Sequence, residues 1–315
     1  MSHRPQAVLE PLKPSNYGGQ AVIEGVMIRG RRTIGLACRK PDGSIYRYRE
    51  PLHSLLLSSG LARLPFLRGL VVLWESLSYG TRMLMKSADL QTPDQEETGP
   101  GTTIAMGLAL VFALLVFVGI PYAATQLLRS TVDNTLLLNV GEGALRMALF
   151  LGYLAIISQL PDIKRVFAYH GAEHMTIHAF EHGDPLTPER IEPYPTAHPR
   201  CGTAFLLFVV VVSIVLFAFV PRTNLIVDLI ARLLLVIPVA SISYEILRLG
   251  AAYERVPGMK WLIAPGLLLQ RITTRRPDPG MIEVAVASLE EAIAGDIEYA
   301  KGSHANVDPA PGATT

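Results

Sequence analysis

The chain has 315 residues, 50% of them hydrophobic and 17% charged, and a mean hydropathy of +0.33, so it is too apolar for an ordinary soluble domain and too charged to lie wholly in a membrane. A net charge of +1, without any stretch that combines basic and aromatic residues, argues against nucleic acid as a partner. The two cysteines, Cys38 and Cys201, are too few and too far apart for a disulfide framework or a CxxC metal clip.

The first hundred residues predict a cytoplasmic region that contains a small antiparallel sheet of about three strands. The opening thirty residues carry charges and prolines but no apolar core, so we expect no signal peptide there. Residues 18–30 read GGQAVIEGVMIRG, and Pro41-Asp42-Gly43 then separates two runs of strand-forming residues, which is typical of a hairpin. Because residues 18–30 contain neither GxGxxG nor a Walker motif, their glycines indicate strand and turn geometry and not a phosphate cradle.

Residues 52–90 predict a helix that lies on the membrane surface. The stretch is strongly apolar, but arginines, a glutamate and a lysine interrupt it. These charges disfavour a membrane span and favour an amphipathic helix at the cytoplasmic interface. Residues 91–101 are polar and contain proline and glycine, so we expect a linker.

Residues 101–250 predict a bundle of about four transmembrane helices, which makes the chain a mainly α, multi-pass membrane protein. Four stretches approach the length that a hydrocarbon core demands. The alternative is a set of buried helices in a large soluble protein, but such helices seldom run this far without a charge. The stretches are residues 103–128, 144–160, 203–220 and 225–247.

Lysines and arginines concentrate in residues 161–202 and in the C-terminal region, which predicts an orientation. Positive loops face the cytoplasm, so we expect both termini and residues 161–202 on the cytoplasmic side of the plasma membrane. Residues 251–301 predict cytoplasmic or interfacial helices. Residues 302–315 have little to pack and predict a disordered tail.

Residues 169–182, YHGAEHMTIHAFEH, hold four of the chain's eight histidines at intervals of four residues. On a helix this spacing places them along one face. His170, Glu173 and His174 form HxxEH, the inverse of the HExxH zinc signature. The pattern predicts a divalent metal, zinc above all, held by the two histidines, with Glu173 as general base. His178 and His182 continue the stripe as accessory candidates.

Further ligands are expected from elsewhere in the chain. His198 and Cys201 lie in HPRC immediately before the third apolar stretch. Glu245, at the end of the fourth, is an ionisable group at a membrane boundary, where such residues often serve a site; alternatively it pairs with Arg248 or is solvated. Asp162 more readily caps the following helix than binds metal.

The histidine stripe has two non-metal explanations. It forms a solvated or headgroup-facing surface with pH-dependent charge, or it consists of hydrogen-bonded structural histidines. Both explanations stand beside metal binding as alternatives.

Four blocks in order resemble the DUF1385 family of YqhQ-like bacterial membrane proteins: GGQAVIEGVMIRG, YHGAEHMTIHAFE, HPRCGTAFLL and SYEILRL. The similarity runs from about residue 18 to about residue 280. It implies a multi-pass membrane protein with a His/Glu/Cys motif region, whose relatives are labelled metal-dependent enzymes, and it supplies no substrate. Met175 stands where the family leads us to expect lysine, and this difference touches no proposed ligand.

Three functional classes remain. The first is a membrane-bound, zinc-type hydrolase that acts at the cytoplasmic face. A di-iron hydroxylase is a further enzymatic variant, but the sequence lacks the additional paired histidines that such a site would require. The second is a non-catalytic membrane assembly or regulatory factor that binds a protein partner or a second copy of the chain. The third handles metal or other ions, although the apolar stretches contain few polar residues for a conduction path.

Overall fold

The computed structural model describes residues 17–54, 60, 64–92, 100–253 and 256–305. Contacts divide the chain into two compact units. The sheet unit comprises residues 1–53, 168–196 and 276–315, and the helical unit comprises residues 54–167 and 197–275. This division differs from the predicted succession 1–100, 101–250 and 251–301, because the sheet unit joins three segments that are distant in sequence.

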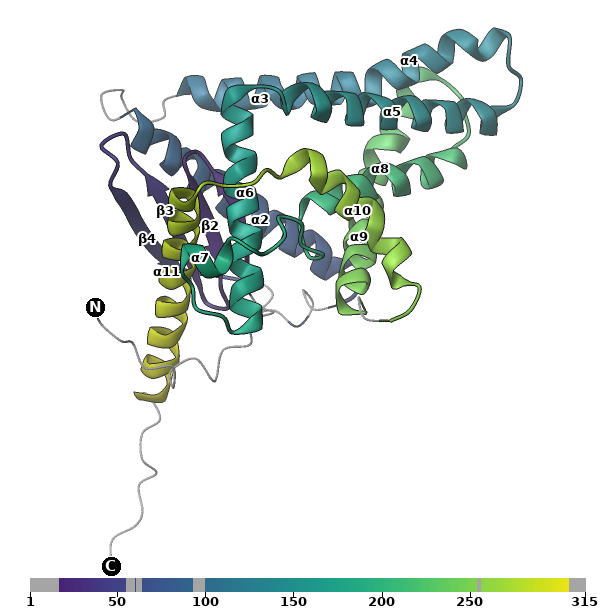
Figure 1. The fold of residues 1–315 in the computed structure, drawn as a ribbon. Coiled ribbons are helices and arrows are strands. Elements are labelled where there is room, and N and C mark those ends of the chain that lie inside the picture. Colours follow the sequence, from purple (N-terminus) through teal and green to yellow (C-terminus); the bar gives the residue numbers. More distant parts are fainter. Residues whose placement is uncertain (1–16, 55–59, 61–63, 93–99, 254–255, 306–315) are drawn as a thin grey trace, which may run out of the picture. The chain divides into compact units, whose positions relative to one another are not determined.

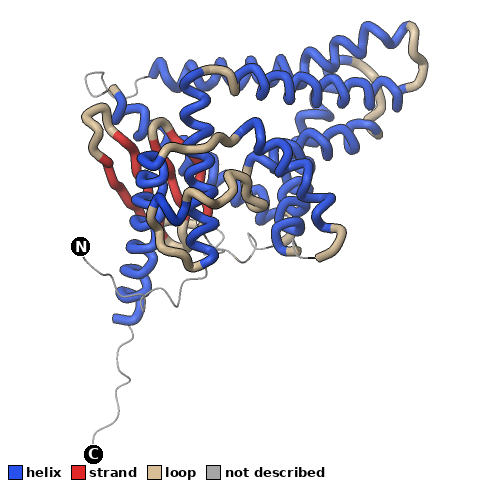
Figure 2. The backbone as a smooth tube through the Cα atoms, viewed as in Figure 1, coloured by secondary structure: helices blue, strands red, loops and turns tan. Residues whose placement is uncertain are grey.

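The sheet unit contains a four-stranded antiparallel sheet among its described residues, in the order β1-β2-β3-β4. Figure 2 draws its strands in red. The prediction of about three strands was one too few, because GGQAVIEGVMIRG folds into a hairpin of its own in which Val22 pairs with Gly25. The predicted turn after Pro41 is confirmed, and Gly43 there has a φ of 83°, which glycine adopts without strain. The strands are β1 (Gly18–Val22), β2 (Gly25–Arg29), β3 (Thr33–Arg39) and β4 (Ile45–Pro51).

Helix α11 (Pro279–Ala305) lies along this sheet and completes its hydrophobic core (Figure 1). The approach is close: a Cβ on Gly35 of β3 would lie 2.2 Å from the carbonyl oxygen of Ser288, so glycine is required there. The prediction of an interfacial C-terminal helix misses this role. The predicted tail 302–315 is helical as far as Ala305, and its remainder lies outside the described residues.

Helix α6 (Pro161–His182) carries the histidine stripe, and its residues from Ala168 onward belong to the sheet unit. Proline suits the first helical position because its missing N–H would have no helical partner there. Asp162 lies in the first turn, where its charge favours the helix dipole. A short helix, α7 (Pro188–Ile191), follows in the same unit.

Three helical stretches among the described residues are long and apolar enough to cross a membrane, judged by length and composition. They are Gly107–Ser130, Thr135–Ile157 (α5) and Leu225–Ala252 (α9). The stretch predicted to be the clearest span forms α8 (Thr203–Ala218), which has 16 residues and is shorter than the other three. The count of four spans therefore stays a prediction.

The first apolar stretch is interrupted by a π turn. Helix α3 (Pro100–Leu114) leads into η4 (Leu115–Gly119), and the chain continues as α4 (Ile120–Leu127) and the single 3₁₀ turn η5 (Leu128–Ser130). The carbonyl oxygen of Phe117, within η4, accepts a hydrogen bond of 2.9 Å from Arg146 Nε on α5. Such π turns often mark a position where a side chain enters a helix ladder.

Helix α5 begins nine residues earlier than the predicted span at 144–160. The added part of the helix contains two polar side chains, Asn139 and Glu142, and both are buried and hydrogen-bonded in the helical unit. The Asn134 side chain caps the true start by accepting a hydrogen bond of 3.1 Å from the N–H of Leu137.

Helix α2 (Leu67–Gln91) confirms a helix in the predicted interfacial segment, and α10 (Met259–Thr273) follows α9 in the same unit. On α2, Trp74 and Leu77 are exposed whereas Tyr79 and Met83 are buried, so the helix has an inner and an outer face. Residues 55–59, 61–63 and 93–99 of the predicted helix and linker lie outside the described residues.

Candidate functional site

The histidine stripe has the geometry that its spacing predicted. His170 and His174 lie on adjacent turns of α6, and their ring centroids are 4.4 Å apart. The rings of His178 and His182 are 6.5 Å apart. Two imidazoles at the first separation lie within the reach of one divalent ion.

His174 is buried, and its hydrogen bonding assigns different roles to the two ring nitrogens. Its Nδ1 lies 2.6 Å from the backbone carbonyl oxygen of Thr196. Because a carbonyl only accepts, Nδ1 carries the proton, and Nε2 holds the lone pair of the neutral imidazole. Histidines that bind metals commonly donate their second N–H to a carbonyl in this way.

Glu173 is held by the N-terminal glycine block. Its Oε1 accepts a hydrogen bond of 2.8 Å from the backbone N–H of Gly19 on β1. Its Oε2 lies 3.5 Å from Nε2 of His174. A Cβ on Gly19 would lie 2.2 Å from the carbonyl oxygen of Met27 on β2, so the close pairing of β1 with β2 requires glycine at this position.

This role of Gly19 is absent from the sequence analysis, which read the block as strand and turn geometry alone. A second link joins the same segments, because the Tyr169 hydroxyl donates to Glu24 Oε2 at 3.3 Å. Glu24 occupies the β1–β2 turn with a φ of 50°, a region that non-glycine residues seldom adopt. The glycines of residues 18–30 are visible in the sequence. The hydrogen bond to Glu173, however, comes from the backbone of Gly19, so no side chain in these residues predicts it.

The residues present fit a divalent metal ion. Two imidazoles stand side by side, one of them with its metal-binding nitrogen defined by Thr196, and a carboxylate lies next to them. A neutral backbone amide, and not a cation, binds Oε1 of Glu173. This hydrogen bond orients the carboxylate without neutralising its charge.

The far end of the stripe is packed differently. The His178 ring stacks on Tyr194, with 6.0 Å between centroids and 6° between planes. His182 Nδ1 lies 2.7 Å from the carbonyl oxygen of His178. The Tyr194 hydroxyl donates to the Asp184 carboxylate, and this hydrogen bond raises the pKa of Tyr194. This packing favours a structural role for the second histidine pair, whose accessory metal role stays a prediction.

His198 and Cys201 lie in the helical unit, so their place beside α6 stays a prediction. Gln270 binds the backbone of His198 twice: Oε1 accepts from its N–H at 2.8 Å, and Nε2 donates to its carbonyl at 2.9 Å. Nδ1 of His198 accepts from the N–H of Arg200 at 3.3 Å, which leaves the ring proton on Nε2 in the neutral form. Cys201 Sγ lies 3.1 Å from Thr203 Oγ1.

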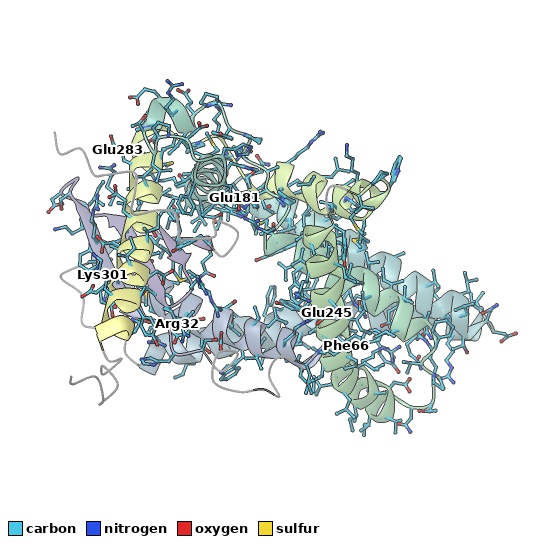
Figure 3. The ribbon with its side chains drawn as sticks, turned by 90° about the horizontal axis from the view of Figure 1, so that it is seen from below. Arg32, Phe66, Glu181, Glu245, Glu283 and Lys301 are labelled. Carbon is cyan, nitrogen blue, oxygen red and sulfur yellow. The ribbon has the colours of Figure 1, made fainter. Side chains whose placement is uncertain are left out.

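Glu245, also in the helical unit, is engaged by an arginine other than the predicted Arg248. Arg68 donates from Nε to Oε1 at 2.8 Å and from Nη2 to Oε2. The N–H of Phe66 adds a bond of 3.1 Å, and the two residues lie side by side in Figure 3. Since both oxygens already bind a guanidinium, this geometry favours an ion pair over a metal ligand.

Comparison with known proteins supplies relatives and no reaction. Residues 64–295 match a family described as a protein of unknown function, DUF1385. An uncharacterised protein of Bacillus subtilis (strain 168), YqhQ, is 35% identical over 296 residues, which cover 89% of this chain and 93% of the relative. No solved structure matches the chain.

Proposed function

Since the chain belongs to the DUF1385 family, whose function is unknown, we propose a function from the geometry of α6: a metal-dependent membrane enzyme of the hydrolase type. His170 and His174 are the proposed ligands of a divalent ion, zinc first, and Glu173 is the proposed general base. His198 and Cys201 remain sequence-based candidates for further ligands. Glu245 is the weakest candidate, because it would have to leave its pair with Arg68.

One observation carries this proposal: the buried His174 donates its Nδ1–H to Thr196 and presents Nε2 next to Oε2 of Glu173. The carbonyl of Thr196 fixes the orientation of the ring, and the carboxylate lies 3.5 Å from the nitrogen that a metal would bind. The same arrangement orients histidine ligands in metal sites.

Glu173, Gly19 and Thr196 would have separate roles in the proposed reaction. Oε1 of Glu173 stays fixed by the Gly19 amide while Oε2 accepts a proton from the attacking water. Thr196 holds the His174 ring in one orientation and one tautomer. A bound divalent ion would supply Lewis acidity and make water a stronger acid.

We further propose that the protein is a multi-pass protein of the plasma membrane with both termini in the cytoplasm. The three membrane-length helices among the described residues support the membrane location. The concentration of lysine and arginine in residues 161–202 and after α9 supports the orientation. On this topology α8 is a fourth, short span, and the histidine stripe faces cytoplasmic substrates.

A non-catalytic assembly or regulatory factor is the second candidate. The stacking of His178 on Tyr194 favours it, because it shows that this helix also uses histidine for packing. In that case a protein partner or a second copy of the chain would take the place of a substrate.

The first test is the metal content of the detergent-purified protein, measured by inductively coupled plasma mass spectrometry after zinc supplementation and dialysis. We expect about one equivalent per chain, as in mononuclear zinc enzymes. The variant His170→Ala/His174→Ala should lose it. His178→Ala/His182→Ala is the matched control, with the same two changes eight residues further along α6, and should keep it.

A metal-free wild type, or equal loss in both double variants, would contradict the proposal. Glu173→Gln then separates enzyme from assembly factor. It keeps an oxygen that can accept from Gly19 but removes the base. If the protein is an enzyme, the Glu173→Gln variant should bind metal but should not complement the phenotype of a strain that lacks the gene. Complementation by Glu173→Gln would favour the assembly factor.

A further inference from the structure

Five buried charged side chains of the helical unit form one cluster, apart from Glu75 and Glu245, which bind Ser54 and Arg68. Three are arginines, Arg146, Arg222 and Arg232, and two are acids, Glu142 and Asp228. Three positive charges against two negative ones leave one positive charge in excess. An uncompensated charge is costly away from water, and more so among membrane-length helices.

Glu142 on α5 is the centre of this cluster, and all three guanidinium groups donate to its carboxylate. Oε1 accepts from Arg146 at 2.8 Å and from Arg232 at 3.1 Å. Oε2 accepts from Arg222 at 2.7 Å and from Arg232 at 2.9 Å. Two donors on each oxygen use the hydrogen-bonding capacity of this carboxylate, but one negative charge balances only one of the three cations.

Asp228 on α9 supplies the second negative charge, and its carboxylate serves other donors. It accepts from the Tyr122 hydroxyl at 2.8 Å, from the Thr223 N–H at 2.9 Å and from the Thr223 hydroxyl at 3.0 Å. Aromatic rings cover the arginines as well, with the Arg232 guanidinium 4.8 Å from the centre of Tyr122. Rings stabilise cations but add no negative charge.

Arg222 uses two of its three guanidinium nitrogens in hydrogen bonds. Its Nε donates to Asn139 at 2.7 Å, and its Nη2 donates to Glu142 and, at 3.0 Å, to Thr125. Nη1 is buried and has no hydrogen-bond partner among the described residues. The residue lies between the end of α8 and the start of α9, where the chain turns back.

We propose that this arginine cluster binds a singly charged oxyanion, the phosphate group of a phospholipid or free phosphate. One negative charge would balance the excess, and a phosphate oxygen would accept from Nη1. The planar guanidinium matches phosphate oxygens in geometry. Because Arg222 lies at the turn between two apolar helices, its level suits lipid headgroups, whose phosphates occupy that end of a span.

Thermal unfolding in a chloride-buffered, uncharged detergent tests the site. Short-chain phosphatidylglycerol and sodium phosphate are added separately, with sodium chloride at equal ionic strength and short-chain phosphatidylcholine as references. We expect phosphatidylglycerol, phosphate or both to raise the Tm of the wild type above both references. A rise with phosphatidylglycerol alone identifies the lipid as the source, and a rise with phosphate alone identifies the free ion.

Arg222→Gln removes the excess charge together with Nη1. It should fold and lose the anion-dependent rise in Tm. Arg271→Gln removes one exposed arginine of the same unit and should keep that rise. An unchanged rise in Arg222→Gln would overturn the proposal.

Native mass spectrometry of the delipidated wild type provides a readout that needs no variant. Added phosphatidylglycerol or phosphate should give one saturable adduct per chain. If neither probe gives an adduct or a rise in Tm, the proposal fails regardless of how the variants fold.

Discussion

Two buried glutamates show how differently the two units treat charge. Glu142 in the helical unit is 1% exposed and accepts from three guanidinium groups. Glu173 in the sheet unit is 3% exposed and accepts from one backbone amide, with an imidazole 3.5 Å from its other oxygen. Equal burial therefore accompanies opposite electrostatics.

The difference between Glu142 and Glu173 indicates which of the two carboxylates can take part in a reaction. Both carboxylate oxygens of Glu142 are occupied by guanidinium groups, so a metal ion or a reacting water would have to displace an ion pair. The carboxylate of Glu173 is positioned by a neutral amide at one oxygen, and its other oxygen faces the imidazole that a metal would use. Burial alone would have ranked the two residues together.

The largest expected effect comes from Glu142→Gln. The change leaves the three surrounding guanidinium groups with Asp228 as the remaining acid of the described cluster, and breaking a buried pair typically costs about 3–5 kcal/mol. Denaturant unfolding in detergent measures the loss. Glu245→Gln is the control, since the side chains of Arg68 and Glu245 remain 21% and 11% exposed, and it should cost about 1 kcal/mol. Equal losses would show that the Glu142 cluster is not the electrostatic centre of the unit.

Gly19→Ala and Gly18→Ala test the other glutamate. A Cβ at position 19 would meet the carbonyl oxygen of Met27 at 2.2 Å, whereas nothing lies within 4 Å at position 18. Overpacking should cost Gly19→Ala about 1–3 kcal/mol, and displacement of the amide from Glu173 should lower its zinc content. Gly18→Ala should match the wild type in its free energy of unfolding and in its zinc content. If both variants bind zinc as the wild type does, the amide of Gly19 does not position Glu173.

The smallest effect concerns a neutral buried group, the thiol of Cys38. Burial, with a contribution from nearby Glu24, raises the pKa of Cys38 to about 12. In a Cys201→Ala variant, alkylation of native protein at pH 8 should be about 1,000-fold slower than in denaturant, because the thiolate is the reactive form. A rate near that of the denatured chain would show that the sheet core opens readily.

The sign of the accompanying pH dependence follows from the raised pKa. The folded state retains the thiol proton where the unfolded chain, with a pKa of about 8.5, releases it. This contribution to stability is complete below that pH and is lost as the pH rises toward about 12. Cys38→Ala should remove this component from the pH profile of unfolding.

Much of the fold follows from patterns that are local in the sequence. Apolar length located the long helices, and the residues after Lys40 located a hairpin. The spacing of His170 and His174 predicted adjacent imidazoles, and their centroids lie 4.4 Å apart. Each of these features depends on neighbours within a few residues, and such regularities are visible in one dimension.

The site's supports are not local, and the sequence analysis missed them. Gly19 and Glu173 are 154 residues apart, and the donor is a backbone amide that every residue except proline possesses. The pair of Arg68 with Glu245 spans 177 residues. The predicted span at 144–160 left out Glu142, whose charge is balanced by arginines distant in sequence, Arg222 and Arg232.

The π turn at Leu115–Gly119 affects how the first apolar stretch tolerates a change in length. A π turn holds one residue more than the α-helical turn it replaces, so loss of one residue there would restore a regular α-helix and keep the later side chains nearly in phase. Tyr122 and Thr125 would still face Asp228 and Arg222, their present partners. A one-codon deletion within the turn should therefore be better tolerated than the same deletion in the regular helix before it, where every later side chain would rotate by about 100°.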